Sequence, residues 1–343
     1  MNKFLGCTLF LILQYPLLWG QLGGEHTYSF LSLETLPEFA ALGGSVVTGK
    51  PSNALTGLYN PATNSSENHK DIALNYTNYI SDINYGAVAT TIALKDRYTS
   101  LHIGALYLDY GTFSGYDLEG TPTTDFSSKE YAIVTGFQSS LSNTDFKYGV
   151  NLKFIHSNLE TYTSSALALD LGMSYYNSLS KFSFAFVVRN LGTQISMYEN
   201  TKETLPLEVN LGASKILKNV AAKWYVNIHN LQDWDLAFSN PNRATEDLIT
   251  GESIAEDPSF FNNLLRHINL GIEILPESDF NIRLGYNFRR SEELRIVDQR
   301  SFSGFSAGFG LKIRRFKLSY AFARYNKAAL SSLFGLNIDL SGK

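Results

Sequence analysis

The gaps between the amphipathic stretches of this chain alternate in length. About fourteen such stretches are recognised by their period of two residues. Tight gaps follow the even-numbered stretches, at residues 95–97, 142–145, 177–181, 217–221, 276–279 and 314–315. Long polar gaps follow odd-numbered stretches, at residues 111–127, 193–204, 233–265 and 290–301. A barrel in an outer membrane joins its strands by short periplasmic turns on one rim and longer extracellular loops on the other. The gap pattern therefore predicts an all-β, up-and-down transmembrane barrel of antiparallel strands.

Length, charge and hydropathy bear on the number of domains, on nucleic-acid binding and on helical membrane spans. A chain of 343 residues is long enough for two domains, but a single barrel also uses this length. The net charge of −4 and the absence of a basic stripe argue against a nucleic-acid partner. Beyond the N-terminus, no apolar run approaches the roughly 18 residues of a membrane-spanning helix.

The N-terminus has the pattern of a secretory signal. Lys3 precedes an apolar run at residues 4–18, and residues 19–21 form a plausible cleavage zone. The sequence thus predicts a signal peptide at residues 1–21. The only cysteine, Cys7, lies within it, so the mature chain is expected to contain no disulfide and no thiolate metal site.

Strict alternation of apolar and polar residues marks the expected strands. In residues 147–154 the even positions are Tyr, Val, Leu and Phe, and the odd positions are Lys, Gly, Asn and Lys. In a soluble sandwich the apolar face would form the core, and alternation alone does not exclude this. Stretches of about 10 to 12 residues match a tilted membrane crossing better, so we expect the apolar face to meet lipid. The polar residues expected to face the lumen include Asn151, Lys153, Asp170, Glu208, Glu273, Arg283 and Arg289.

Aromatic residues near the strand ends fit the girdles that membrane barrels place at the two interfaces. They are Tyr76, Tyr79, Tyr110, Tyr148, Tyr175, Tyr176, Trp224, Trp234 and Tyr325.

A barrel of fourteen strands should leave a lumen that needs filling. Residues 22–70 lack a strand pattern and carry several apolar anchors, namely Phe30, Leu31, Leu33, Leu36, Phe39 and Leu42. We expect this segment to be a plug or hatch folded into the barrel from the periplasmic side. The alternative is an extension packed beneath the barrel. The expected organisation is a signal peptide at 1–21, the plug at 22–70 and the barrel at 71–343.

Several short stretches carry a family resemblance by their order and spacing. They are residues 23–25, 30–31, 40–44, 60–62, 83–86, 151–155, 157–160, 170–172, 190–194 and 231–235. The chain resembles the PorQ proteins of the type IX secretion system, relatives of the PorV branch of the long-chain fatty-acid transporter barrels. The wider family combines a Gly-Gly and Asn-Pro-Ala hatch with fourteen strands. The hatch residues here are Asn60, Pro61 and Ala62.

The resemblance implies a place in the outer membrane of Bacteroidetes. There the barrel would belong to the complex that attaches secreted cargo to the cell surface. It would hold a PorZ-like surface subunit beside the sortase partner and a PorV-like barrel, in contact with the bilayer and with lipopolysaccharide. The family's alternative role is transport of hydrophobic solutes past a hatch gate. The largely polar inward residues favour an anchor over an apolar conduit.

No catalytic, cofactor-binding or metal-binding residue is predicted. The six His residues form no His-Glu-x-x-His motif, and the mature chain has no thiol nucleophile. A membrane-barrel hydrolase would need a Ser–His pair, which nothing in the sequence singles out. The acidic residues of the gap 233–265 lack the spacing of a calcium loop.

The expected extracellular loops are the candidate partner surface. The gap 233–265 is the longest, and long loops are usually functional or disordered. Aromatic side chains dominate interface energies, which makes Trp234, Phe238, Phe260 and Phe261 the first candidates. Phe113, Tyr116 and Tyr198 are secondary candidates in two other loops. The alternative is a flexible loop that folds over the lumen mouth.

Overall fold

The computed structural model describes most of the chain. The described residues are 26–49, 53–94, 98–199, 201–237, 245–246, 253–254, 259–294, 302–327 and 329–341. The predicted signal peptide and the first part of the predicted plug lie outside them. No helix within these residues is long and apolar enough to cross a membrane.

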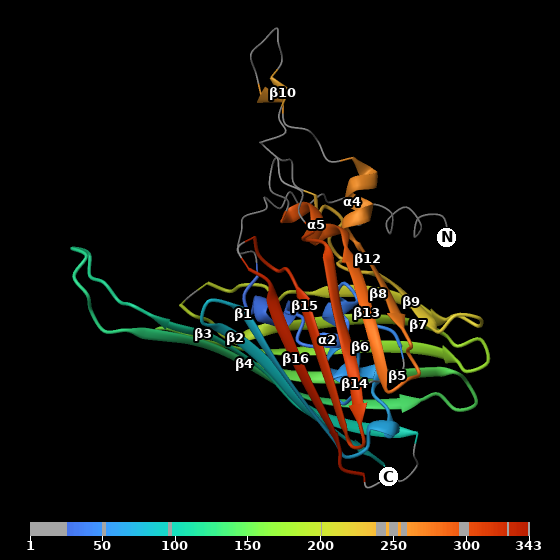
Figure 1. The fold of residues 1–343 in the computed structure, drawn as a ribbon. Coiled ribbons are helices and arrows are strands. Elements are labelled where there is room, and N and C mark those ends of the chain that lie inside the picture. The colour runs from blue at the N-terminus through green and yellow to red at the C-terminus, as the bar shows by residue number, and fades with distance from the viewer. Residues whose placement is uncertain are drawn as a thin grey trace, which may run out of the picture.

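Fourteen antiparallel strands close into one barrel, in which each strand pairs with its neighbours along the chain and β1 closes on β16 (Figure 1). The strands are β1 (Asp71–Ile80), β2 (Ile83–Ala93), β3 (Thr99–Phe113), β4 (Phe126–Ser140), β5 (Phe146–Leu159), β6 (Tyr162–Asn177), β7 (Phe182–Ser196), β8 (Glu208–Ile216), β9 (Ala222–Ile228), β12 (Ile268–Ile274), β13 (Phe280–Asn287), β14 (Phe305–Ile313), β15 (Phe316–Ala323) and β16 (Ser331–Asp339). The predicted fold class is confirmed. A separate pair, β10 (Thr245–Glu246) and β11 (Ser253–Ile254), lies outside the barrel.

Loop lengths differ between the two rims. One rim carries only short connections, at residues 94–98, 141–145, 178–181, 217–221, 275–279 and 314–315. The other rim carries the long connections 114–125, 197–207, 229–267 and 288–304, together with 324–330 and the tight turns 81–82 and 160–161. We call these the short-turn rim and the long-loop rim. Helices α4 (Phe260–Arg266) and α5 (Phe288–Glu293) stand on the long-loop rim (Figure 1).

Strand lengths are less uniform than the predicted 10 to 12 residues. Strands β3 to β7 contain 14 to 16 residues, whereas β12 to β16 contain 7 to 9. The prediction was wrong here because alternation ends where the chain turns into a helix or an irregular loop. At β13, for example, Asn287 ends the strand and its side chain caps α5 by accepting a hydrogen bond from the Arg290 amide.

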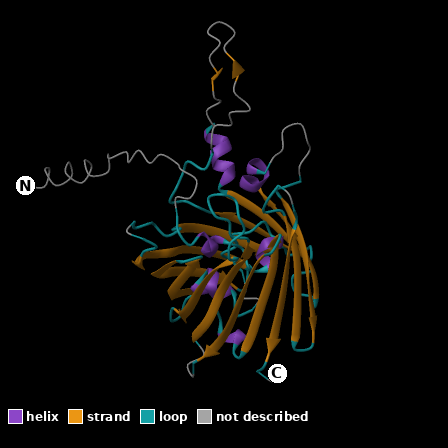
Figure 2. Ribbon diagram, turned by 90° about the vertical axis from the view of Figure 1, so that its left-hand side faces the viewer, coloured by secondary structure: helices purple, strands orange, loops and turns teal. Residues whose placement is uncertain are grey.

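Residues 26–49 and 53–70 lie inside the barrel, and we call them the interior segment (Figures 1 and 2). It contains only short turns: η1 (Ser29–Ser32), α2 (Pro37–Ala41), α3 (Thr56–Tyr59), η2 (Pro61–Thr63) and η3 (Ser66–Asn68). His26 forms a bridge with Thr204 at the long-loop rim, and the Lys70 amide donates to the Thr91 carbonyl at the short-turn rim. The segment therefore extends from one rim of the barrel to the other.

The apolar core of the molecule lies between the interior segment and the barrel wall. Leu31, Leu36 and Leu58 are buried in one cluster with wall residues such as Leu106 and Val134. A soluble sheet would bury its apolar face, but here the reverse holds for most of the wall. Burial of the segment's own Leu and Phe side chains supplies the driving force that keeps it inside.

The two faces of the wall are oriented as alternation predicts. Asn151, Lys153 and Asp170 are fully buried on the inside, and Glu208, Glu273 and Arg283 are also buried there. Leu152, Phe154 and Leu169 are exposed on the outside. Arg289 was predicted wrongly. It lies on α5 beyond the end of β13, half-exposed, with its Nε 2.6 Å from Glu293 Oε1.

The predicted aromatic girdle holds only in part. Tyr76, Tyr148 and Tyr176 are exposed on the exterior. Tyr79 and Tyr325 instead contact each other, with ring centroids 6.0 Å apart, and Tyr325 lies beneath the Arg290 guanidinium at 5.3 Å. The girdle prediction failed for Tyr79 because its position in the alternation of β1 places it on the inward face, and for Tyr325 because it lies beyond the end of β15.

Candidate functional site

Inward side chains around the wall donate hydrogen bonds to backbone carbonyls of the interior segment. Short turns leave many of the segment's carbonyls without a partner in regular structure, and buried carbonyls need one. The donors come from eight strands: Asn75 to Thr35 at 2.9 Å, Tyr85 to Glu34 at 2.9 Å, Asn151 to Gly57 at 3.0 Å, Ser174 to Ala62 at 3.0 Å, Arg189 to Leu31 at 2.9 Å, Asn269 to Gly44 at 3.2 Å, Asn287 to Gly43 at 3.0 Å and Ser306 to Ala41 at 3.2 Å. The polar inner face is thus a binding surface for the segment.

The Asn60-Pro61-Ala62 turn lies against β5 and β6. The Asn60 side chain accepts a hydrogen bond from the Ala62 amide at 3.0 Å and donates to the Val47 carbonyl at 3.0 Å. A Cβ on Gly149 would lie 2.5 Å from the Pro61 carbonyl carbon. Glycine is therefore required on the wall for this turn to pack so closely.

The Gly43-Gly44 turn has a similar contact with β13. Both glycines have positive φ, at 99° and 87°. A Cβ on Gly285 would overlap the Gly43 amide nitrogen. This turn follows α2 and brings the Ser45 amide to 3.2 Å from Glu34 Oε2.

A charged pair lies on the wall between β5 and β7. Lys153 Nζ is 2.9 Å from Asp170 Oδ1 and donates to Asn190 Oδ1 at 2.8 Å, with the lysine and aspartate both fully buried. Asn151 donates to Asp170 Oδ2 at 2.9 Å. His102 Nε2 lies 2.8 Å from Asn151 Oδ1. These contacts satisfy both charges, as a buried pair requires.

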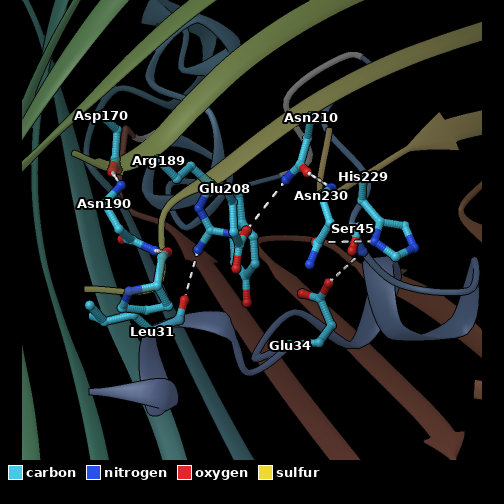
Figure 3. A network of polar contacts seen from close by, with 12 residues as sticks. Leu31, Glu34, Ser45, Asp170, Arg189, Asn190, Glu208, Asn210, His229 and Asn230 are labelled. Carbon is cyan, nitrogen blue, oxygen red and sulfur yellow. Dashed lines mark hydrogen bonds and ion pairs between the residues drawn. The ribbon is translucent and has the colours of Figure 1, made fainter. Parts of the chain in front are cut away.

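Arg189 joins the wall to the segment (Figure 3). Its Nη1 lies 2.9 Å from Glu208 Oε2, and its Nη2 donates to the Leu31 carbonyl at 2.9 Å. The guanidinium also lies 5.1 Å from the centroid of the Tyr59 ring. Sequence reasoning did not single out this arginine.

Glu34 holds two arms of the interior segment together. Its carboxylate accepts hydrogen bonds from the Leu36 amide at 3.3 Å and from the Ser45 amide at 3.2 Å (Figure 3). Complete burial raises the pKa of this carboxyl to about 7, against the opposing effects of the Tyr59 hydroxyl and the Arg189 charge. Glu34 belongs to the interior segment and not to a membrane-spanning strand.

The first partner-binding candidates gather beside α4. Trp234 stacks on His267, with ring centroids 4.9 Å apart, and its centroid lies 5.5 Å from that of Phe260. Phe260 and Phe261 are 70% and 65% exposed at the start of the helix. Ser259 caps α4 by accepting from the Asn262 amide. Phe238 lies outside the described residues.

The secondary candidates are not brought together with α4. Phe113 ends β3 and stacks on Phe126 at 5.3 Å, so it lies on a strand rather than in a loop. Tyr116 is exposed in the loop between β3 and β4, which projects away from α4 (Figure 1). Tyr198 is half-buried, and its ring lies 6.4 Å from Tyr28 of the interior segment.

No family model and no curated protein sequence matches the chain. Among solved structures, a mutant of the TodX monoaromatic hydrocarbon channel is 12% identical, with a TM-score of 0.44 over 84% of this chain and 94% of that one. A BamA from Haemophilus ducreyi lacking POTRA domains 1–3 is 11% identical, with a TM-score of 0.33 over 79% and 70%. LpxR from Salmonella typhimurium is 8% identical, with a TM-score of 0.33 over 78% and 99%. At these values none carries a functional argument.

The chain's own geometry defines its class. A closed barrel satisfies its backbone hydrogen bonds between strands, and an exposed apolar exterior suits hydrocarbon. The chain is an outer-membrane β-barrel whose lumen holds part of its own N-terminal region. Among the described residues, no group of three or more His, Cys, Asp or Glu side chains is arranged to hold a metal ion.

Proposed function

We propose that this chain is a sealed anchor of the type IX secretion and cell-surface attachment complex. It holds a PorZ-like surface subunit at its long-loop rim, beside the sortase partner and a PorV-like barrel. The supporting observation is the occupied lumen, in which side chains of eight strands bind the carbonyls of the interior segment. Because the lumen is filled, a soluble partner would bind at the rim rather than inside the barrel.

The energetics of the lumen favour a seal. Each hydrogen bond between wall and segment contributes about 1 kcal/mol net, and leaving a buried carbonyl without a donor costs about 1–3 kcal/mol. Opening a path for solute would break many of these bonds together. The segment's buried leucines add further stability to the closed state.

The docking surface proposed for the partner is the aromatic group at α4. Phe260 and Phe261 are large apolar side chains left exposed on the rim, next to the ordered stack of Trp234 on His267. Rigid aromatic side chains of this kind are typical interface anchors. His267 Nε2 lies 3.1 Å from the Trp234 carbonyl and its Nδ1 lies 2.7 Å from the His229 carbonyl, so the ring at the base of the group is held between two backbone oxygens.

An affinity pulldown from detergent-solubilised outer membranes tests the proposal. The intact chain is compared with the double variant F260S/F261S and with Y116S, which removes an exposed aromatic on a different loop. Recovery of a large surface protein by the intact chain and Y116S, but not by F260S/F261S, is the expected result. Recovery by all three would show that the partner binds a loop that carries none of these substitutions. If none recovers a partner, the anchor proposal is wrong.

One observation supports a second candidate, transport of a hydrophobic solute. The register between β6 and β7 shifts at Leu169/Leu171, and Asn190 has φ of 60°. Pairing of β7 with β8 stops at Arg189, although β7 continues to Ser196. A wall with a weakened seam is suited to lateral release of an apolar molecule. Saturable binding of a fluorescent fatty acid to the purified chain, weakened by displacing the Asn60 turn with G149V, would favour this role.

A further inference from the structure

Lys223 is a buried cation whose charge no described carboxylate contacts. It is the second residue of β9, faces inward and is 7% exposed. Its ammonium lies 4.6 Å from the centroid of the Tyr225 ring. Among the described residues, no hydrogen bond or ion pair joins this ammonium to an acidic side chain. Burial of a cation without an anion is costly, so its presence calls for an explanation.

The neighbouring carboxylate is already occupied. Glu273 lies opposite Lys223 in register, but its Oε1 accepts from Arg283 Nε at 2.9 Å. Its Oε2 accepts from the Tyr225 hydroxyl at 2.8 Å. Farther round the wall, Lys317 lies 3.9 Å from Glu38 of the interior segment. Both Glu273 oxygens are thus engaged by Arg283 and Tyr225 rather than by the Lys223 ammonium.

Unpaired polar groups lie on the adjoining part of the inner wall and on the segment beside it. Ser214 Oγ, Asn227 Nδ2 and Thr48 Oγ1 are buried without a partner among the described residues. Thr48 and Asn227 both lie against Gly212, whose Cβ would be 2.9 Å from Thr48 Cγ2 and 2.7 Å from Asn227 Oδ1. Ser214 on β8 pairs with Tyr225 on β9. Buried polar atoms left in this state normally bind water, an ion or a ligand.

Gly49 places the interior segment next to the lysine. A Cβ there would lie 3.1 Å from Lys223 Nζ, and the φ of 116° excludes most other residues. The backbone following Thr48 therefore passes close to the ammonium without a side chain in between. Lys223 and Asn227 on β9, Ser214 on β8 and Thr48 of the segment thus face the same part of the lumen, which we call the lysine corner.

We propose that this corner binds one small oxyanion of the phosphate class, reached from the short-turn rim. A phosphate offers several strong acceptor oxygens, which suits an ammonium surrounded by hydroxyl and amide donors. Only Ala222 separates Lys223 from the short turn at 217–221, so the route from that rim is short. The site is independent of partner binding at α4.

Isothermal titration calorimetry of inorganic phosphate into the full chain tests the site. The protein is held in maltoside detergent, which carries no phosphate, at an ionic strength fixed with chloride. The variants are K223M, S214A as a milder change, and K312M as a control that removes an exposed lysine from the same rim. Loss of a hydrogen bond to a charged group predicts a weakening of roughly 10- to 100-fold for K223M and less for S214A. K312M should stay within about twofold.

Two results would overturn the proposal. One is the absence of saturable phosphate binding to the intact chain, which would mean that water satisfies these donors. The other is an equal loss in K223M and K312M, which would indicate general surface attraction. If K223M does not fold, S214A tests the site instead: unchanged phosphate binding in S214A would overturn the proposal. A parallel titration with glycerophosphoglycerol, a soluble phospholipid headgroup, identifies the source: tighter binding than phosphate points to a lipid headgroup, and weaker binding to the free ion.

Discussion

Lys153 and Asp170 place two opposite charges where neither side chain meets solvent. Such pairs add little net stability compared with apolar residues, but breaking one is strongly destabilising because it leaves an uncompensated buried charge. The pair also fixes Asn190 and Asn151, which bind the segment and the neighbouring strands. Its role is thus to specify one arrangement of the lumen.

The single variant D170N should therefore destabilise the folded barrel by about 3–5 kcal/mol, because Lys153 keeps its charge without a counterion. The double variant K153M/D170L should lie within about 2 kcal/mol of the intact chain, since both charges are gone. Urea unfolding in detergent, followed by electrophoretic mobility, measures both. Equal losses in the single and double variants would contradict this account.

Glu34 should make seating of the interior segment depend on pH. Because its folded pKa is raised to about 7 from a model-peptide value of 4.5, the folded state favours the protonated form. The corresponding stability is fully present below about pH 4.5 and is lost as the pH rises through about 7. Protease cleavage of the segment should increase between about pH 5 and pH 7 in the intact chain, relative to a control substrate. The variant E34Q, which cannot titrate, should show no such increase.

Arg189 illustrates why part of the site escapes sequence reasoning. Arg189 and Asn190 are consecutive, yet both are buried inside the barrel. The register shift between β6 and β7 and the positive φ of Asn190 break the alternation at this point. By contrast, Asn151, Lys153 and Asp170 lie on regularly alternating strands, so their inward orientation was predictable. Glu34 lies in irregular backbone, where no helix or strand periodicity predicts which way a side chain points.

At the scale of elements, wall and segment are fitted to each other through glycines. Gly285 allows the Gly43 turn to approach β13, and Gly149 allows the Asn60 turn to approach β5. Strands β5, β6 and β13 were recognisable because their period of two is regular. Helices α4 and α5 were not, because each contains fewer than eight residues and lies in a gap that read as polar loop. Short helices of this kind depend on capping and local packing.

The variant G285A should displace the Gly43 turn while the barrel still closes, since the added Cβ overlaps the turn's backbone. The expected result is faster protease cleavage within residues 26–70, with unchanged heat-resistant mobility of the barrel. L284A, which shortens an outward side chain on the same strand, should leave cleavage unaffected. Unchanged cleavage in G285A would show that the close contact between Gly285 and the Gly43 turn is not needed to hold the interior segment in place.

At the scale of the whole molecule, the barrel is expected to be closed to ions. Fourteen strands enclose a space wide enough for a channel unless it is filled. The filling here is continuous with the wall in its packing and hydrogen bonds, and its residues form the main buried cluster. Closure is therefore a property of the N-terminal region rather than of the strand count.

Removing the segment should convert the closed barrel into a conducting one. The intact chain is expected to give no step-like currents in planar bilayers, whereas a variant lacking residues 27–68 should give them if its wall still closes. Circular dichroism confirms the strand content of that variant. Currents of equal size from both proteins would show that the lumen is open despite the segment.

The unequal strands have a consequence for the surrounding lipid. At about 3.3 Å per residue and a tilt of about 40°, the 8 residues of β13 rise only about 20 Å, while the 16 of β6 rise about 40 Å. Hydrocarbon beside the short wall must therefore compress, at a fraction of a kcal/mol per Å of mismatch. A neighbouring protein of similar height would relieve that compression. Lipid compression therefore favours protein–protein contact at the side of the barrel formed by the short strands.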